Sequence, residues 1–333
     1  MSQLPDHEPM LIEKANAEKY GLCRIPGLVM TDKNTLLGYY ECRSDYSDWA
    51  QIDLKVIRSR DLGESFEEAL LIEGNGDTLN NPVMIVNGDS IHLLFLCNYH
   101  RLYHSVSTDD GITFSEPKDI TSVLESDVPY TVAAVGPGHG IVREGRMIVP
   151  LWFGYNPDDP KAHHPSSVRT LYSEDNGKAW QLGDVIGEDV LHDANESALA
   201  VNADGRVIIS IRHNTDGEKN RAISVSDNGI GGWSEVKFEK NLPDPRCMGS
   251  MFSYEGAVYH INCVTESGRK NLTVKKSEDN FATFEGFPVS EKGGYSDLVI
   301  HNGVAYVLYE RDVLHKTDVE NNDGLYFTKI NLK

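Results

Sequence analysis

The sequence lacks the features of membrane-spanning and exported proteins. No apolar run in its 333 residues approaches the ~18 residues that a membrane-spanning helix needs. The segment at its start, MSQLPDHEPMLIEK, has no basic region followed by an apolar core. A secretory signal requires both, so we expect a cytoplasmic protein that does not act on membranes.

Cysteine is scarce, and its arrangement excludes two structural classes. The five cysteines are odd in number and widely spaced, and no two form a Cys-x-x-Cys pair: Cys23, Cys42, Cys97, Cys247 and Cys263. A disulfide framework needs even numbers at short spacings, and a structural zinc site needs paired ligands. We therefore expect reduced, mostly buried thiols, no metal and no cofactor.

Positive charge is also in short supply. Thirty-one Lys and Arg face 51 Asp and Glu, which gives a formal net charge of −20. Nucleic acids and anionic membranes require a basic surface, so the sequence argues against both as partners. An anionic substrate would be repelled by the average field. Any anion site must therefore depend on a local arginine cluster inside a cleft.

Helical periodicity is rare, the first 19 residues being the main candidate for a helix, whereas one short pattern recurs. It reads Ser-x-Asp-x-Gly-x-x-aromatic. Three copies are intact, at 59–66, 107–114 and 173–180. Two are degenerate: in 277–284 Phe281 replaces the glycine, and the copy around Asp227 has an extra residue and lacks the leading serine.

Each copy has the chemistry of a β-hairpin turn. An alternating strand precedes it, the aspartate bonds nearby amides, and the glycine is free to take a positive φ. One hairpin about every 50 residues is typical of a β-propeller with four-stranded blades. We therefore predict an all-β, six-bladed propeller over residues 20–333, with residues 1–19 packing on it or closing it. The flanks 27–43 and 324–333 are expected to join as the sixth blade.

The repeat resembles the Asp-box of the sialidase superfamily, and the resemblance extends from about residue 20 to the end of the chain. Asp-boxes alone indicate only the fold. Further motifs occur in the order expected of a sialidase, and they read RIPGLV, LLGYYECR, NNPVMIV, GPGHGIV, NESALAV, IRHN, PDPRCMGS, GRKNLTV, GYSDLV and LYE. This order makes the resemblance specific and implies an exo-α-sialidase.

By this resemblance, three arginines grip the carboxylate of a sialic acid: Arg24, Arg212 and Arg269. Arginine suits this task because its planar guanidinium binds a carboxylate in bidentate fashion and never loses its charge. Glu310 is expected to orient Arg24. These residues would supply the local cationic cluster that the net charge demands.

The resemblance assigns Tyr295 as nucleophile and Glu196 as its base. A phenol has an ordinary pKa near ~10, so it needs a base beside it. A neutral tyrosine also avoids the like-charge repulsion that a carboxylate nucleophile would meet at a carbon bearing a carboxylate.

The general acid is expected in the loop SDYSDWAQID. Asp48 best fits the family spacing from Arg24 and Arg43, with Asp45 as the alternative. Asp53 is expected on the solvent face of the following strand.

Two further residues are implied to contact the sugar ring: Arg43, through a hydroxyl, and Asn81, where many bacterial members have aspartate. His139 and Cys247 lie on segments that border the site in the family, with a structural role equally open. His163 and His164 are interpreted as part of a solvated loop.

The sequence thus predicts a retaining exo-α-sialidase acting on small sialylated oligosaccharides or glycoconjugates, with its oligomeric state undetermined. One alternative is a non-catalytic propeller that binds acidic sugars. Others are a trans-sialidase, or a sialidase that prefers a deaminated sialic acid. Loop shape would decide among these, and the motifs do not reveal it.

Overall fold

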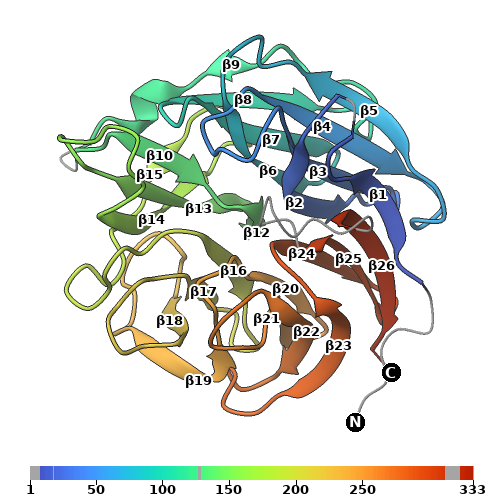
Figure 1. Ribbon diagram of the computed structural model, residues 1–333. Helices are drawn as coiled ribbons and strands as arrows, with labels where there is room; N and C mark the ends of the chain where they lie inside the picture. Colours follow the sequence, from blue (N-terminus) through green and yellow to red (C-terminus); the bar gives the residue numbers. More distant parts are fainter. Residues whose placement is uncertain (1–7, 18, 127–128, 312–322, 333) are drawn as a thin grey trace.

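The computed structural model describes residues 8–17, 19–126, 129–311 and 323–332, and it shows six small antiparallel sheets arranged in a ring (Figure 1). The predicted six-bladed β-propeller is therefore confirmed. Within the described residues the helical structure is one 3₁₀ turn, η1 (Thr121–Leu124). These residues include no helix that is long and apolar enough to cross a membrane.

We number the sheets as blades one to six along the chain. Blade one contains β2 (Leu22–Met30), β3 (Leu36–Arg43), β4 (Ile52–Ser59) and β5 (Glu67–Ile72). Blade two contains β6 (Leu79–Asn87), β7 (Ser90–Cys97), β8 (Arg101–Ser107), β9 (Lys118–Asp119) and, parallel to β6, β11 (Gly138–His139). Blade three contains β10 (Val132–Val135), β12 (Ile141–Arg143), β13 (Arg146–Gly154), β14 (Ser166–Ser173) and β15 (Gln181–Leu182).

The remaining blades have four strands each. Blade four contains β16 (Ser197–Val201), β17 (Val207–Ile211), β18 (Asn220–Ser226) and β19 (Lys237–Pro243). Blade five contains β20 (Ser250–Tyr254), β21 (Ala257–Cys263), β22 (Lys270–Ser277) and β23 (Glu285–Lys292). Blade six contains β24 (Ser296–His301), β25 (Val304–Arg311), β26 (Gly324–Asn331) and β1 (Met10–Lys14).

Ring closure differs from our expectation. The segment 27–43 does not join 324–333; it belongs to β2 and β3 of blade one. The strand that pairs with β26 is β1, so residues 10–14 are extended rather than helical. A free edge on β26 would expose unpaired backbone groups, and β1 satisfies them. The division of the chain at residue 20 stays a prediction.

The core lies between blades. Inner strands such as β2 are buried along nearly their whole length, whereas the outer strand β5 is partly exposed. Across the seam of blades six and one, Leu36 packs with Leu308 and Phe327. Because each sheet buries both faces against its neighbours, the inner strands are held rigidly around the axis, where β2 contacts β6 and β24.

The recurring turns carry a common set of hydrogen bonds. Ser59 Oγ accepts from the Gly63 amide at 2.8 Å, and Asp61 Oδ1 accepts from the Ser65 amide at 3.0 Å. The copy near residue 227 corrects our interpretation. Ser226 is its leading serine, because its Oγ accepts from the Asn228 backbone amide. The aspartate position is taken by Asn228 rather than Asp227, and Asn228 Oδ1 accepts from the Ile230 amide at 2.9 Å.

Phe281 occupies the glycine position of the blade-five turn. Its φ is 69°, yet its side chain is fully buried and packs edge-on against His260, with ring centroids 5.6 Å apart. The left-handed conformation costs about 1 kcal/mol, and removing a buried phenyl group costs about 3–5 kcal/mol. We therefore expect Phe281→Gly to lower the free energy of unfolding by about 2–4 kcal/mol, as measured by urea unfolding. The free energy of unfolding of Phe281→Leu should fall between those of wild type and Phe281→Gly. A Phe281→Gly variant more stable than wild type would contradict this account.

Two histidines pack between blades two and three. His92 Nδ1 and His104 Nε2 lie 3.0 Å apart, and His92 Nε2 lies 3.0 Å from Asn176 Oδ1. Burial, reinforced by His92 and Lys118, lowers the pKa of His104 to about 4. An imidazole in the unfolded chain has a pKa of about 6.5. The unfolded chain therefore binds more protons as the pH falls from about 6.5 to about 4, and stability is lost over that range.

From His104 we expect a loss of about 2 kcal/mol in the free energy of unfolding between pH 7 and pH 5. His104→Gln keeps a donor for His92 but does not titrate, so its stability should change less between these pH values. The exposed His192 offers a matched control, His192→Gln, which should behave as wild type. Urea unfolding at both pH values measures this. Equal losses in wild type and His104→Gln would contradict the prediction.

Candidate active site

Arg24 lies where the innermost strand of blade one is interrupted. The pairing of β2 with β3 shifts register between Arg24 and Gly27, and Ile25 takes a φ of 57°. This conformation is strained for a β-branched residue. Glu310 at the end of β25 holds it: Oε1 accepts from Arg24 Nε at 3.0 Å and from the Ile25 amide at 3.1 Å. Glu310 thus contacts Arg24, as its expected orienting role requires.

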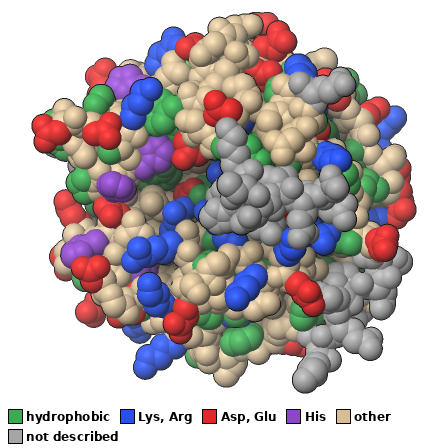
Figure 2. Space-filling view, in the orientation of Figure 1, with side chains coloured by type: hydrophobic (Ala, Val, Ile, Leu, Met, Phe, Trp, Pro, Cys, Tyr) green, Lys and Arg blue, Asp and Glu red, His purple; other side chains and the backbone are tan. Residues whose placement is uncertain are grey.

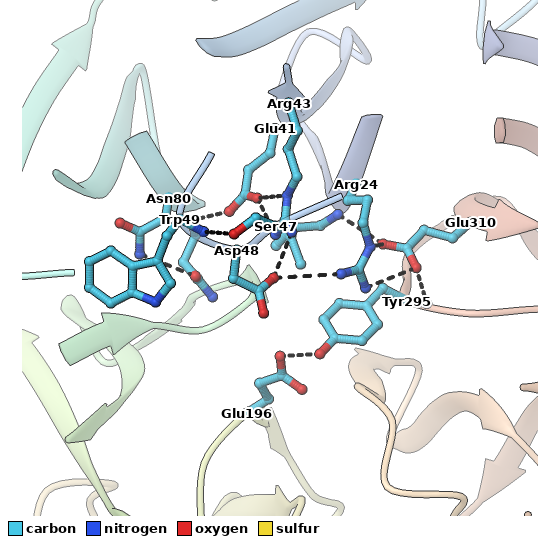
Figure 3. A network of polar contacts seen from close by, with 12 residues as sticks. Arg24, Glu41, Arg43, Ser47, Asp48, Trp49, Asn80, Glu196, Tyr295 and Glu310 are labelled. Carbon is cyan, nitrogen blue, oxygen red and sulfur yellow. Dashed lines mark hydrogen bonds and ion pairs between the residues drawn. The ribbon is translucent and has the colours of Figure 1, made fainter. Parts of the chain in front are cut away.

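Tyr295 and Glu196 meet across the ring from blades six and four. The Tyr295 hydroxyl donates to Glu196 Oε1 (Figure 3). Arg212 Nη1 donates to the other oxygen of that carboxylate. Arg212 Nη1 also lies 2.8 Å from the Tyr295 hydroxyl. Tyr295 is 4% exposed and Glu196 is 9% exposed. The phenol and its expected base are therefore in direct contact in a nearly dry environment.

The charges around this pair keep the proton on the phenol. Burial and the Glu196 charge raise the pKa of Tyr295 above its ordinary value, although the three nearby arginines oppose this. Burial disfavours ionisation of Glu196, but the Arg212 charge and the Tyr295 hydrogen bond hold the pKa of Glu196 below its usual range. Glu196 is therefore an ionised acceptor for the hydrogen bond from the Tyr295 phenol.

The three expected arginines converge on Tyr295. The guanidinium carbons of Arg24 and Arg269 each lie 4.8 Å from the centre of its ring, and Arg212 contacts its hydroxyl. Arg212 Nε and Arg269 Nη1 are buried and have no hydrogen-bond acceptor among the described residues. These donors can bind an anion without breaking an existing hydrogen bond. On the face seen in Figure 2, Lys and Arg side chains gather nearer the centre, and acidic ones lie along the rim.

Asp48, in the loop after β3, lies near Arg24 and Arg43. Its Oδ1 accepts from Arg43 Nη1 at 2.6 Å and lies 3.9 Å from Arg24 Nη1. Burial opposes its ionisation, but the charges of Arg43 and Arg24 lower the pKa of Asp48. Asp45, the alternative, instead accepts from the Ser47 amide at 2.7 Å in an exposed turn. The structure therefore brings Asp48, and not Asp45, to the arginine cluster.

Arg43 and Asn81 are held by Glu41, a residue that sequence reasoning missed. Glu41 Oε2 accepts from Arg43 Nε at 2.8 Å, and Oε1 accepts from the backbone amide of Asn81 at 2.7 Å. Arg43 and Glu41 are both 0% exposed. The only sequence signal for Glu41 was its place two residues before Arg43 in YYECR.

The three arginines, Tyr295 and Glu196 line one cavity of about 240 Å³. Its lining includes most of the predicted site residues, namely Arg24, Arg43, Asp48, Asn81, Glu196, Arg212, Arg269 and Tyr295. Glu310 lies behind the lining, fully buried. A separate hollow of about 280 Å³ includes His139 and Phe252 in its lining. His139 bonds Asp297 at 2.8 Å, so it serves the structure rather than the arginine cavity. Cys247 is buried and packs against Tyr295.

Two expectations about flanking residues were wrong. Asp53 is buried rather than on the solvent face, because it accepts from the Tyr20 hydroxyl at 2.8 Å and the Gly74 amide at 2.9 Å. His163 is not a solvated loop residue; it is half-buried and lines the cavity. Its ring lies 4.7 Å from that of Tyr99 and 5.4 Å from that of Trp152. Burial lowers the pKa of His163.

The comparisons with known proteins agree with this fold. A family model described as a BNR repeat-like domain matches residues 68–307. The chain belongs to this family. Through its repeat and its relatives it is a member of the sialidase superfamily, as the sequence predicted.

Among curated relatives, a sialidase of Bacteroides fragilis is 28% identical, and the match covers 92% of this chain and 63% of that protein. This chain therefore spans less than two thirds of that relative's length. Among solved structures, Hadza microbial sialidase Hz136 has a TM-score of 0.82 at 22% identity, covering 97% of this chain and 68% of the other. A Trypanosoma rangeli sialidase, solved with 2,3-difluorosialic acid as a covalent intermediate, has a TM-score of 0.78 at 17% identity. The match covers 100% of this chain and 59% of that one. At such identities the structures support the fold alone.

Proposed function

We propose that this chain is a retaining exo-α-sialidase that hydrolyses α-glycosides of sialic acids. The observation that carries the proposal is the buried contact between the Tyr295 hydroxyl and Glu196, with Arg24, Arg212 and Arg269 around the same ring. The named sialidases among its relatives support the substrate class. Small sialylated oligosaccharides or glycoconjugates are the proposed substrates.

Substrate binding depends on the arginines. A sialic acid carries its carboxylate on the anomeric carbon, so gripping the carboxylate fixes the reacting centre. Arg212 Nε and Arg269 Nη1, which have no hydrogen-bond acceptor among the described residues, donate to the oxygens of this carboxylate. Their charges also offset the repulsion expected from the net charge of −20. Arg43 and Asn81, which line the cavity beside Asp48, bind the ring substituents.

The first chemical step breaks the glycosidic bond. Asp48 donates a proton to the leaving oxygen, which departs as an alcohol. The Tyr295 oxygen forms a bond to the anomeric carbon while its proton moves to Glu196. A neutral nucleophile avoids repulsion from the substrate carboxylate, and Glu196 is already in contact with the hydroxyl, so this transfer needs little rearrangement.

The second step releases the sugar. Asp48, now a carboxylate, takes a proton from water, and the water oxygen attacks the anomeric carbon. The tyrosyl bond breaks, and Tyr295 recovers its proton from Glu196. Two displacements at one carbon retain its configuration. The same residues would serve a trans-sialidase, in which a sugar hydroxyl replaces the water.

The direct test is release of a phenol from aryl 2-α-sialosides by the purified protein. Both the N-acetylated and the deaminated sialic acid are supplied, and NMR of the first sugar released reports its anomeric configuration. We expect turnover of at least one substrate with retention. Binding of free sialic acid without turnover of either substrate would favour the non-catalytic binding propeller. An inverted product would overturn the tyrosine mechanism.

A further inference from the structure

Two buried carboxylates occupy corresponding places in neighbouring blades. Glu310, on β25 of blade six, accepts from the Ile25 amide of β2 in blade one at 3.1 Å. Glu41, on β3 of blade one, accepts from the Asn81 amide of β6 in blade two at 2.7 Å. Ile25 and Asn81 both take positive φ values, 57° and 52°. Each lies where the pairing of an innermost strand shifts register.

Each carboxylate also holds an arginine of the cavity. Glu310 binds Arg24, and Glu41 binds Arg43 through Nε at 2.8 Å and Nη2 at 2.6 Å (Figure 3). Both arginines lie near Asp48, but Arg24 Nη1 is 3.9 Å from its Oδ1, and Arg43 makes the closer contact. The remaining terminal nitrogen of Arg43, Nη1, donates to Asp48 at 2.6 Å. One fully buried guanidinium therefore connects a fully buried glutamate to the proposed acid.

The charges of Glu41 and Arg43 affect how strongly Asp48 holds its proton. An acid that protonates a leaving group must retain a proton during turnover. Arg43 and Arg24 lower the pKa of Asp48, with His163 acting in the same direction. Tyr99 also interacts with Asp48, Glu41 and Arg43, but it is neutral because burial raises its pKa. Burial raises the pKa of Glu41, and the Arg43 charge opposes this. In its ionised form Glu41 places a second carboxylate on Arg43 and so divides its positive charge between two anions.

We propose that Glu41 is a positioning residue for Asp48. It fixes the Arg43 guanidinium in one orientation and offsets part of the positive charge that Arg43 presents to Asp48, which makes it easier for the Asp48 carboxyl to carry the proton that it gives to the leaving group. The inference rests on the proposed function, because it assigns Asp48 the role of general acid. It concerns a residue that touches no substrate and acts through Arg43.

Glu41→Gln tests the charge with little change in shape. Glutamine can still accept from the Asn81 amide, but Arg43 then faces Asp48 as an uncompensated cation. We expect the alkaline limb of the kcat/KM profile to move to lower pH by about one pH unit, given the partial screening at Asp48. Above that limb, turnover of a sialoside with a sugar alcohol as leaving group should fall about tenfold. A 4-nitrophenyl sialoside, whose leaving group needs little protonation, should fall about twofold or less.

Three further variants separate this role from a structural one. Glu41→Asp keeps the charge and should restore the pH profile. In an Asp48→Asn background, Glu41→Gln should have no further effect on the ratio of the two substrates, because it acts through Asp48. Asp297→Asn is the matched control: Asp297 is buried and accepts from the Leu28 amide of β2 at 2.8 Å, outside the arginine cavity. Its ratio and pH profile should match wild type even if stability falls.

Each outcome bears on a different claim. Glu41→Gln that slows both substrates equally, with an unmoved pH profile, overturns the positioning role and leaves the proposed function standing. Glu41→Asp that behaves as Glu41→Gln overturns the role of the charge. Wild type that turns over neither substrate overturns the proposed function and this inference with it.

Discussion

Tyr295→Phe is expected to lower kcat by at least about 10³-fold on every sialoside that the wild type hydrolyses. The substitution removes the atom that attacks the anomeric carbon, and Glu196, which would remain, faces repulsion from the substrate carboxylate. The three arginines keep their positions, so substrate binding should change little. Steady-state kinetics with an aryl 2-α-sialoside measures the loss, and titration with free sialic acid measures the binding.

The controls for this prediction distinguish lost chemistry from lost structure. Tyr295→Phe keeps the ring that Arg24 and Arg269 contact, and Glu196 keeps its ion pair with Arg212. We therefore expect a thermal midpoint close to that of wild type. Glu196→Gln should also reduce kcat, since it removes the base. Near-normal turnover by Tyr295→Phe would exclude the tyrosine as nucleophile, whatever the effect of Glu196→Gln.

The fold was largely predictable because blades one to five each carry the same local turn. Ser59, Asp61 and Gly63 satisfy one another within a few residues, so their chemistry is visible in the sequence. Ring closure was not visible in this way. The pattern does not recur in the sequence of blade six, and β1 is a short strand whose conformation depends on pairing with β26, more than 300 residues away. A contact of that range leaves no local pattern to read.

The candidate site divides in the same manner. Arg24, Tyr295 and Glu196 stand in recognisable motifs, and the structure brings them together; their catalytic roles stay predictions. Glu41 was missed because its importance comes from an amide in the next blade and an arginine beyond it. His163 was missed because the rings that bury it, Tyr99 and Trp152, come from other parts of the chain. Local sequence does not encode such cross-blade contacts.

The net charge and the site are compatible because the arginines are not equally neutralised. Glu310 engages Arg24, and Glu196 engages Arg212, so part of the cluster's charge is balanced within the protein. Arg269 lies 3.8 Å from Glu310, a longer ion pair, and keeps a buried donor without an acceptor among the described residues. Partial balance lowers the cost of burying three cations and still leaves donors for a substrate anion.

Glu310→Ala is expected to have the largest effect on stability. Glu310 is 0% exposed, and its two oxygens accept from Arg24 Nε, the Ile25 amide and the Tyr295 amide, the last at 3.2 Å. Alanine would leave these donors buried without their acceptor and leave Arg24 with only its longer ion pair to Asp48. Breaking a buried pair in this way costs about 3–5 kcal/mol. Urea unfolding should show a loss of that size.

The same substitution should reduce activity beyond the loss of folded protein. Glu310 holds the backbone on both sides of the cavity, at Ile25 and at Tyr295, so its removal should displace Arg24 relative to the phenol. Glu310→Gln keeps an acceptor for two of the donors and should recover part of the stability, but it lacks the charge that pairs with Arg24. Kinetics at a temperature where each variant is folded separates the two effects. A Glu310→Ala variant as stable and as active as wild type would mean that Ile25 holds its left-handed conformation, and Arg24 its place, without the carboxylate.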